Sequence, residues 1–311
     1  MLRLLAPLAA LLLAPAVAAS VSEHRLTTEP TAGEVAAYGG KVVWTRGVDA
    51  GPHQEYRLVE SSPAGPRDLP VASSLEPFQV DVGPGADGQP VAVYVRCTGG
   101  NRCDVYTYDL ARGRETHVDG IAAAGCPATE PSIWRGKIVF IRQNLFTAGC
   151  VSGLYLRAAN GKVTRLLREP PALKGAVYQP HLRRGWVAFA AAGDDSTTSE
   201  IQVMRIRDRR SRKVTQARGE VGLYPLPGVP PDRPLGTGFN VTAPHLLGAF
   251  VYWVRWDIAH NTRTVGRARR LRPRKKRYAV IPAGATISGG RLYVDDGRGL
   301  VESPLPAFGP R

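Results

Sequence analysis

What the chain lacks already narrows its class. Aromatic residues make up 7% of the 311 positions, and lysine supplies only 7 of the 41 basic residues, the rest being arginine. After the first twenty residues, no apolar run reaches the ~20 residues that a membrane-spanning helix needs. The 34 glycines and 26 prolines leave little room for long helices. With 43% hydrophobic and 22% charged residues, the composition excludes a mainly disordered chain and suits a globular core.

Catalytic and cofactor signatures are also missing. The sequence contains no GxSxG elbow, no HExxH pair, no GxxxxGK[ST] phosphate loop and no acidic calcium loop. The four cysteines lack the second CxxC-like pair or the histidines at zinc spacing that a metal site requires. We therefore expect no cofactor and no metal ion, and we favour a protein without enzymatic activity.

The first residues have the features of a signal peptide. Arg3 precedes the apolar run Leu4–Leu13, and Ala16-Val17-Ala18 provides the small residues of a cleavage site. No cysteine follows the run, which argues against a lipid anchor. The pattern predicts a leader over residues 1–19 and an exported, monomeric single domain over residues 20–311, extracellular or in the periplasm or cell envelope.

Cysteine usage agrees with export. An even number of cysteines in an oxidising compartment favours disulfide bonds. Three pairings of Cys97, Cys103, Cys126 and Cys150 are possible. Cys97 and Cys103 flank a short turn-forming segment, so we favour the pairs Cys97–Cys103 and Cys126–Cys150.

An internal repeat predicts the fold. A polar residue and a glycine, followed by alternating apolar residues, recur about every 40–50 residues with one longer interval. Two further segments with period-two alternation follow in each copy, and one strand enters each glycine turn. Four antiparallel strands per repeat form the blade of a β-propeller. The sequence therefore predicts an all-β, six-bladed β-propeller, with turn glycines at Gly40, Gly88, Gly136, Gly185, Gly248 and Gly290.

The last copy lacks its final strand, and the N-terminal segment supplies a substitute. His24–Thr28 precedes the first blade, and adding it to the last copy completes one normal repeat. Pairing of these two ends closes the ring and removes free sheet edges. Two stacked β-sandwiches are the alternative, but they do not explain six regularly spaced glycine turns.

Several repeats show a family resemblance. The segment Glu130–Ile141 resembles the WD40-like repeat of TolB-type propellers, and Gln179–Phe189 and Ala243–Tyr252 are poorer copies. Asp104–Leu110, followed by Arg112-Gly113, is similar to the tyrosine strand of that repeat. The resemblance implies a propeller fold without specifying an activity, since such repeats occur in binding modules, sugar-active enzymes and parts of peptidases. The chain lacks the separate α/β domain of TolB, so a TolB transport role does not carry over.

Two histidines occupy the same position in the repeat. His181 and His245 each follow a proline, and Ser132 holds this position in the third copy. We expect them to start the innermost strands and to ring the channel mouth on the face with the long loops, near Tyr178, Asp194, Asp195, Trp256, Asp257 and His260. There the imidazoles are weak candidates for a metal site or an acid–base pair. The alternative is that the position tolerates any small or polar residue at a strand start.

Adjacent acids are a further candidate. Asp194-Asp195 and Asp295-Asp296 provide paired carboxylates, which glycoside hydrolysis uses at a set separation. Both pairs lie in predicted turns, so we interpret them as solvated turn residues.

Positive charge dominates the third-to-fourth strand turns of blades four and five. Such a patch attracts polyanions, and arginine binds carboxylate and phosphate bidentately. Nucleic acid is disfavoured, because the segment Arg267–Arg277 has no aromatic residue for base stacking. An arginine-rich composition that merely gives a solvated basic edge is the alternative. The candidate binding residues are Arg205, Arg207, Arg209, Arg210 and Arg212, and Arg267, Arg269, Arg270, Arg272, Arg274, Lys275 and Lys276.

Two functional hypotheses follow. The first is a non-enzymatic propeller that binds a protein or an anionic polymer, such as an acidic polysaccharide, at the cell envelope. The second is a lyase or hydrolase of acidic oligosaccharides, in which arginine neutralises a uronate carboxylate and His181 or His245 transfers protons. Convergence of both histidines, an arginine and a carboxylate in one pocket is the feature that would favour the second.

Overall fold

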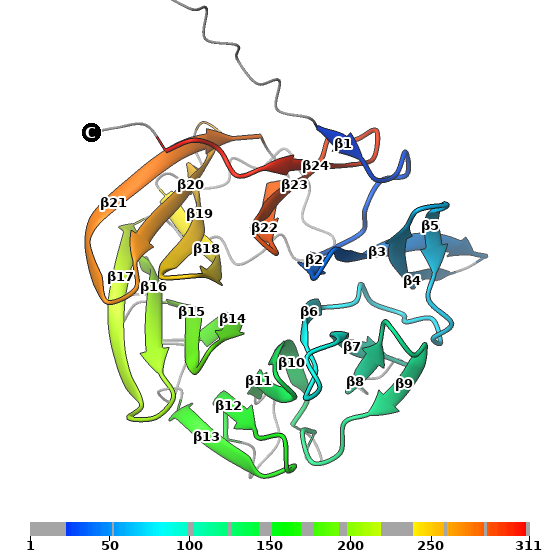
Figure 1. The fold of residues 1–311 in the computed structure, drawn as a ribbon, viewed down its shortest axis with the longest axis horizontal. Coiled ribbons are helices and arrows are strands. Elements are labelled where there is room, and N and C mark those ends of the chain that lie inside the picture. Colours follow the sequence, from blue (N-terminus) through cyan, green and yellow to red (C-terminus); the bar gives the residue numbers. More distant parts are fainter. Residues whose placement is uncertain are drawn as a thin grey trace, which may run out of the picture.

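The structure is a computed structural model that describes residues 23–51, 53–98, 103–122, 126–142, 151–168, 177–192, 198–218, 239–257, 260, 262–282 and 285–308. Within these ranges the regular structure consists of strands, arranged as six four-stranded antiparallel sheets around a central axis (Figure 1). The predicted six-bladed β-propeller is thus confirmed. In the same ranges, no helix is long and apolar enough to cross a membrane. The predicted leader over residues 1–19 lies outside the described residues.

In each blade the four strands are ordered from the innermost, at the central channel, to the outermost, at the rim. Blade one contains, in this order, β2 (Val35–Tyr38), β3 (Lys41–Ala50), β4 (His53–Ser62) and β5 (Gly65–Asp68). Blade two contains β6 (Val80–Pro84), β7 (Pro90–Cys97), β8 (Cys103–Asp109) and β9 (Arg114–His117). Blade three contains β10 (Ala128–Trp134), β11 (Lys137–Arg142), β12 (Gly153–Arg157) and β13 (Val163–Arg168). Blade four contains β14 (Val177–Arg183), β15 (Trp186–Ala192), β16 (Thr198–Arg205) and β17 (Arg210–Arg218). Blade five contains β18 (Phe239–Leu247), β19 (Phe250–Asp257), β20 (Thr262–Arg269) and β21 (Arg272–Ile281). Blade six contains β22 (Ala285–Ser288), β23 (Arg291–Asp295), β24 (Leu300–Pro304) and β1 (His24–Arg25).

The six predicted glycines form the turns between the first and second strands. All six have positive φ, from +57° at Gly248 to +87° at Gly88, a region that residues with a Cβ rarely enter. In blades three and four the preceding residues, Arg135 and Arg184, also have positive φ, of 51° and 47°. Two consecutive residues with positive φ make a type I′ turn, whose twist matches that of the flanking strands.

The N-terminal strand closes the ring, as predicted. His24 and Arg25 of β1 pair with Glu302 and Val301 of β24, and the backbone N–H of Leu26 donates to Leu300 over 2.8 Å. The turn after β23 reinforces this closure, because Asp296 forms an ion pair of 2.7 Å with Arg25. Asp295 accepts hydrogen bonds of 2.8 Å from both the backbone N–H and the hydroxyl of Thr31. The two acids therefore have a structural role in addition to their place in a turn.

The blades pack through apolar faces that alternate with polar residues along each strand. Between blades four and five, for example, Ile201 and Val203 pack against Val251 and the fully buried Trp253. The period-two pattern of the sequence thus places one layer of side chains between each pair of sheets.

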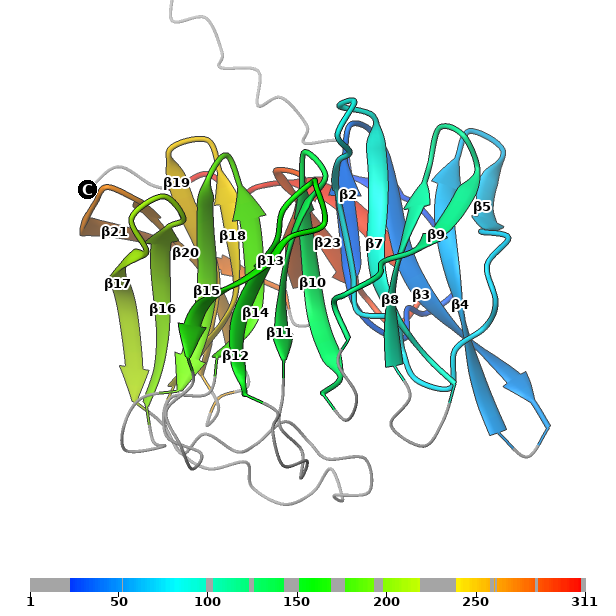
Figure 2. The ribbon, with the colours of Figure 1, turned by 90° about the horizontal axis from the view of Figure 1, so that it is seen from below.

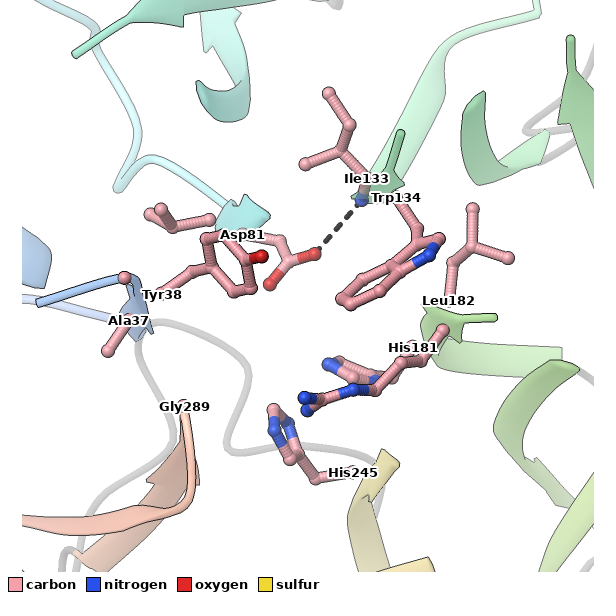
Figure 3. Close-up of a pocket in the computed structure, with 12 residues that line it drawn as sticks. Ala37, Tyr38, Asp81, Ile133, Trp134, His181, Leu182, His245 and Gly289 are labelled. Atoms are coloured by element: carbon pink, nitrogen blue, oxygen red, sulfur yellow. Dashed lines mark hydrogen bonds between the residues drawn. The ribbon is translucent and has the colours of Figure 1, made fainter. Parts of the chain in front are cut away.

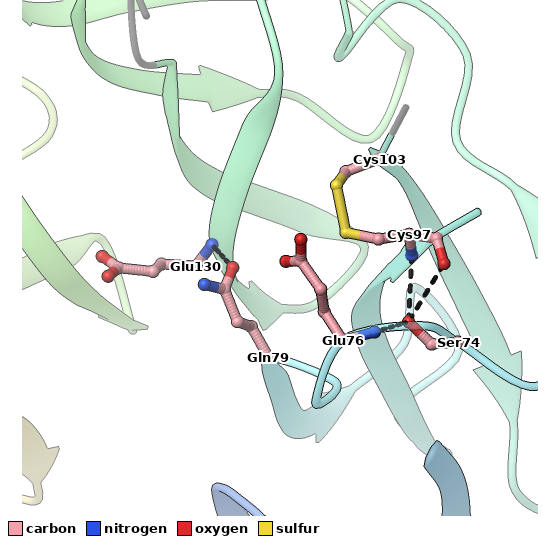
Figure 4. Close-up of a disulfide and its surroundings, with 6 residues drawn as sticks. All are labelled: Ser74, Glu76, Gln79, Cys97, Cys103 and Glu130. Carbon is pink, nitrogen blue, oxygen red and sulfur yellow. Dashed lines mark hydrogen bonds between the residues drawn. A yellow bond between two sulfur atoms is a disulfide. The ribbon is translucent and has the colours of Figure 1, made fainter. Parts of the chain in front are cut away.

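One predicted disulfide bond lies at the edge of blade two. Cys97 ends β7 and Cys103 begins β8, and their sulfur atoms are bonded (Figure 4). Ser74 holds this hairpin in place, because its hydroxyl accepts a hydrogen bond of 3.1 Å from the backbone N–H of Cys97. Cys126 is also disulfide-bonded, and its predicted partner Cys150 lies outside the described residues.

The two faces of the ring differ. Figure 2 shows the short turns at one end of the blades. We call this end, which carries the first-to-second and third-to-fourth strand turns, the tight-turn face. The second-to-third strand connections lie at the opposite end. The segments 143–150, 193–197 and 219–238 lie outside the described residues.

Candidate functional site

The innermost strands of blades three, four and five share a bulge. Their pairing shifts register after Thr129, Tyr178 and Thr242, and the residues that follow, Glu130, Gln179 and Ala243, have positive φ of 51°, 50° and 48°. Each is followed by a proline, which has no N–H to contribute to the ladder. A residue other than glycine in this conformation requires support from its surroundings.

Side chains of the preceding blade provide that support. Gln79 accepts a hydrogen bond of 2.8 Å from the backbone N–H of Glu130, as Figure 4 shows. The carboxylate of Glu130 accepts the N–H of Gln179, and Gln179 in turn accepts the N–H of Ala243 over 2.7 Å. The bulges are therefore stabilised from blade to blade across the channel wall.

The bulges change the predicted position of the histidines. The prediction that His181 and His245 start their strands is wrong, because Val177 begins β14 and Phe239 begins β18. The strand continues through the proline, which the bulge accommodates. Both histidines lie near the far ends of these strands, and they face the channel at the tight-turn face rather than on the face of the long loops.

A second layer of hydrogen bonds links the histidines to blades two and three. Asp81 accepts a hydrogen bond of 2.7 Å from the hydroxyl of Ser132, which accepts one of 2.9 Å from the backbone N–H of Leu182. His181 continues the series, because its Nδ1 accepts the backbone N–H of Leu246 over 3.0 Å. This bond fixes the tautomer of the neutral ring, with its hydrogen on Nε2.

A pocket of about 140 Å³ opens where these innermost strands end. Tyr38 and Asp81 lie across the cavity from His181 and His245, and the indole of Trp134 lies between the two groups (Figure 3). The lining residues are Ala37, Tyr38, Gly39, Asp81, Val82, Ile133, Trp134, His181, Leu182, Arg183, His245 and Gly289.

The two histidines form a close pair of neutral imidazoles. Their ring centroids are 3.8 Å apart. Burial lowers the pKa of His181 well below its usual value, with further contributions from His245 and Arg183. Burial and Arg183 together lower the pKa of His245 to about 3. Neither ring therefore carries a positive charge near neutral pH.

Arg183 is the cationic group of the pocket. Its guanidinium lies 5.1 Å from the ring of Trp134 and donates a hydrogen bond of 3.0 Å to the carbonyl of Leu246. Among the described residues it forms no ion pair, and its Nε is buried without a hydrogen-bond partner. Burial lowers the pKa of Arg183, and the neighbouring Arg184 and Arg270 add to this effect.

The carboxylates of the channel have raised pKa values. Burial raises the pKa of Asp81 to about 6, although the hydrogen bonds from Ser132 and Ile133 act in the opposite direction. Glu34 is accessible to the channel, yet enclosure by the packed walls, together with the charges of Glu130 and Asp81, raises its pKa to about 8. The channel is thus a place where carboxyl groups hold protons more tightly than in water.

The other residues predicted to surround the histidines lie elsewhere or are not described. Asp257, which follows Trp256 and ends β19, pairs with the exposed His260, with 3.0 Å between Oδ2 and Nδ1, at the face opposite the pocket. Tyr178 lies nearer to the bulge, where burial raises its pKa to about 12. Asp194 and Asp195 lie outside the described residues.

Four lining residues, Asp81, Arg183, Trp134 and Tyr38, were not among the residues predicted from the sequence. A signal for three of them is present, because Tyr38, Trp134 and Arg183 each directly precede the two central residues of a tight turn. This shared position places large side chains at the same level of the channel in blades one, three and four. Asp81 shows no comparable pattern.

The basic residues predicted to bind a polyanion lie on blades four and five, which are neighbours in the ring. The outer strands β17 and β21 lie side by side (Figure 1), and Arg212 donates a hydrogen bond of 3.3 Å to the carbonyl of Leu271 in the turn of blade five. We call this surface the basic edge. It is defined by Arg205, Arg207, Arg209, Arg210, Arg212, Arg267, Arg269, Arg270, Lys275 and Lys276; the side chains of the predicted members Arg272 and Arg274 are not among those that the structure describes.

Some members of the basic edge already have contacts. Arg267 lies 4.2 Å from the ring centroid of Phe308, and Arg270 lies 5.1 Å from that of Trp186. Arg270 also donates to the carbonyl of Gly248. In contrast, the turn between β16 and β17 holds four exposed cations that form no ion pair within the described residues: Arg205, Arg207, Arg209 and Arg210.

A metal site does not emerge from the described side chains. The one cluster of three potential ligands in these ranges consists of Glu76, Cys97 and Cys103, and its two sulfur atoms are joined in the disulfide bond (Figure 4). Thiolate ligands are therefore not available there.

Comparison with known proteins identifies the fold alone. No protein-family model and no curated protein matches the chain. Among solved structures, TolB from Acinetobacter baumannii is similar over 86% of this chain and 64% of its own, with 14% identity and a TM-score of 0.52. This chain thus spans less than two thirds of the length of that TolB. A prolyl endopeptidase is similar over 92% of this chain and 43% of its own, with 13% identity and a TM-score of 0.50. A puromycin hydrolase is similar over 86% of this chain and 50% of its own, with 15% identity and a TM-score of 0.50. The predicted resemblance to TolB-like propellers is confirmed at the level of the fold.

Proposed function

We propose that this protein is an exported, non-enzymatic propeller that binds an anionic polymer through the basic edge. The predicted leader and the disulfide bonds support export to an oxidising compartment. The rigid ring supports a binding role, since it presents charges in a fixed arrangement that costs little ordering entropy on association.

The observation that carries this proposal is the pairing of like charges across strands. Arg205 lies directly opposite Arg210, and Arg267 lies opposite Arg277. Directly opposed like charges destabilise a sheet. A bound polyanion relieves this repulsion, and the planar guanidinium groups bind carboxylates or phosphates bidentately.

The proposal is tested by titrating the mature chain with polygalacturonate, with neutral dextran as the control polymer. We expect binding to polygalacturonate that weakens as salt is raised, because exposed charges are screened over about 10 Å at 0.1 M salt. Replacing Arg205, Arg207, Arg209 and Arg210 with glutamine removes the unpaired cluster. This variant is expected to bind roughly tenfold or more weakly, a change of about 1.4 kcal/mol.

A matched variant separates local binding from net charge. Replacing Arg114, Lys137, Lys162 and Arg165 with glutamine removes the same number of exposed cations from blades two and three. We expect this variant to bind almost as well as the wild type. Equal losses in the two variants would show that total charge, and not the basic edge, governs binding.

A second candidate is acid–base chemistry on acidic oligosaccharides. His181, His245, Arg183 and Asp81 do converge in one pocket, which is the arrangement that this alternative requires. Against it, a general base works best when its pKa is near the working pH, and the pKa of His245 is about 3. The same titration distinguishes the two candidates: the appearance of unsaturated or reducing ends, abolished in the variants His181→Ala and His245→Ala, would make the protein an enzyme.

A further inference from the structure

The pocket at the tight-turn face contains buried polar groups that nothing in the described structure satisfies. The side chain of His245 is only 7% exposed, and its Nε2 has no hydrogen-bond partner. The Nε of Arg183 is also buried without a partner. A buried polar atom without a partner has lost its hydrogen bonds to water without replacement, so two such atoms beside one cavity indicate a missing ligand.

The charge of the site favours an anion. Arg183 is half-buried and forms no ion pair in the described ranges. Arg184 and Arg270 add to the positive potential around it, and Asp81, on the opposite side of the cavity, offsets part of that potential. Stacking on Trp134 orients the guanidinium plane, and one of its terminal nitrogens is already bonded to Leu246. The edge that contains Nε remains for a bidentate contact, the geometry that a carboxylate provides.

The size and the walls of the pocket favour a compact ligand. A cavity of about 150 Å³ accommodates a molecule the size of benzene, and this pocket measures about 140 Å³. The aromatic rings of Trp134 and Tyr38, which are in edge contact with centroids 5.9 Å apart, line the cavity (Figure 3). Leu182 and Val82 add apolar surface.

From this geometry we propose that the pocket binds a free, compact monocarboxylic acid with a planar or apolar body, whose carboxylate contacts Arg183 and His245. Asp81 lies across the cavity from His245, so a second carboxylate on the ligand would be repelled. The site therefore selects monocarboxylates over dicarboxylates. It is a separate site from the basic edge, because none of the residues that define that edge lines the pocket.

Calorimetric titration with benzoate tests the inference on the intact mature protein. Benzoate is expected to bind, whereas benzamide, its neutral isostere, and terephthalate, with a second carboxylate, are expected to bind at least tenfold more weakly. Arg183→Met should weaken benzoate binding at least tenfold. Arg184→Met, which removes the adjacent exposed charge, should change it less than threefold. Absence of benzoate binding, equal binding of benzamide, or equal losses in the two variants would overturn the inference.

Two further measurements distinguish failure of this inference from misfolding and from failure of the proposed function. His245→Phe removes the buried nitrogen that lacks a partner and keeps a planar ring against His181. This variant is expected to fold, to lose benzoate binding and to retain polygalacturonate binding. Retained benzoate binding in this variant would contradict the proposed contact. Displacement of benzoate by polygalacturonate would assign the pocket to a polymer end and overturn the inference of a free ligand.

Discussion

The carboxyl group of Asp81 lines the channel pocket, and its burial affects the stability of the folded protein. Its carboxylate accepts hydrogen bonds from the hydroxyl of Ser132 and the backbone N–H of Ile133, yet burial raises its pKa from 3.8 to about 6. The ionised form therefore costs more free energy in the folded state than it does in the unfolded chain.

This cost predicts a specific pH dependence. Below pH 3.8 the carboxyl is protonated in both states and there is no penalty. Between pH 3.8 and 6 the unfolded chain releases the proton first, so stability falls as pH rises, and above pH 6 the full penalty is present. Asp81→Asn keeps an acceptor for both hydrogen bonds and removes this pH-dependent cost.

Thermal unfolding of the wild type and of Asp81→Asn at pH 4 and pH 7 measures the effect. The difference between the two proteins is expected to favour the variant more at pH 7 than at pH 4. A difference that is the same at both pH values would show that Asp81 titrates as it does in water.

At the scale of the elements, the innermost strands are joined by side chains and not only by apolar packing. Ser132 on β10 donates to Asp81 on β6 and accepts from the backbone N–H of Leu182 on β14. One hydroxyl thus connects three blades at a buried position.

Ser132→Ala is expected to lower the free energy of unfolding by about 1–3 kcal/mol, because it leaves the buried N–H of Leu182 without an acceptor. Urea denaturation measures this loss. Ser211→Ala, at an exposed position on β17, is the control and should change stability by less than about 0.5 kcal/mol. Similar values for the two variants would mean that water replaces the serine at no cost.

At the scale of the whole molecule, stability depends on closing the ring. Gly299 has a φ of +123°, and a Cβ at this position would lie 2.0 Å from the carbonyl oxygen of Thr27. Gly297, in the same turn, has a φ of +75° but open space around it. Alanine at Gly297 therefore measures the cost of positive φ alone, whereas alanine at Gly299 adds the clash with the N-terminal segment.

Gly299→Ala is expected to destabilise the protein by about 2 kcal/mol or more beyond Gly297→Ala, because β1 must move away from β24. Gly297→Ala alone should cost roughly 1–2 kcal/mol. Thermal unfolding gives the difference, and limited proteolysis of the N-terminal segment shows whether the closure has opened. If both variants lose the same stability and resist proteolysis equally, the close approach of Gly299 and Thr27 does not control ring closure.

The sequence by itself determined the blades, their number, their turns, the closing strand and the pairing of Cys97 with Cys103. These features depend on short-range patterns, since period-two alternation and glycines with positive φ act within a few residues. It also located the basic edge, because its charges are contiguous in the chain.

Only the tertiary structure decided the composition of the channel pocket. Asp81, Ser132, His181 and His245 belong to four different blades, and they meet because the innermost strands of successive blades converge on one axis. The level of Ser132, His181 and His245 in the channel depends on the bulges before Pro131, Pro180 and Pro244, which carry each strand through the proline toward the tight-turn face. These bulges are stabilised by side chains of the preceding blade, a contact between residues far apart in the chain that no local pattern reveals.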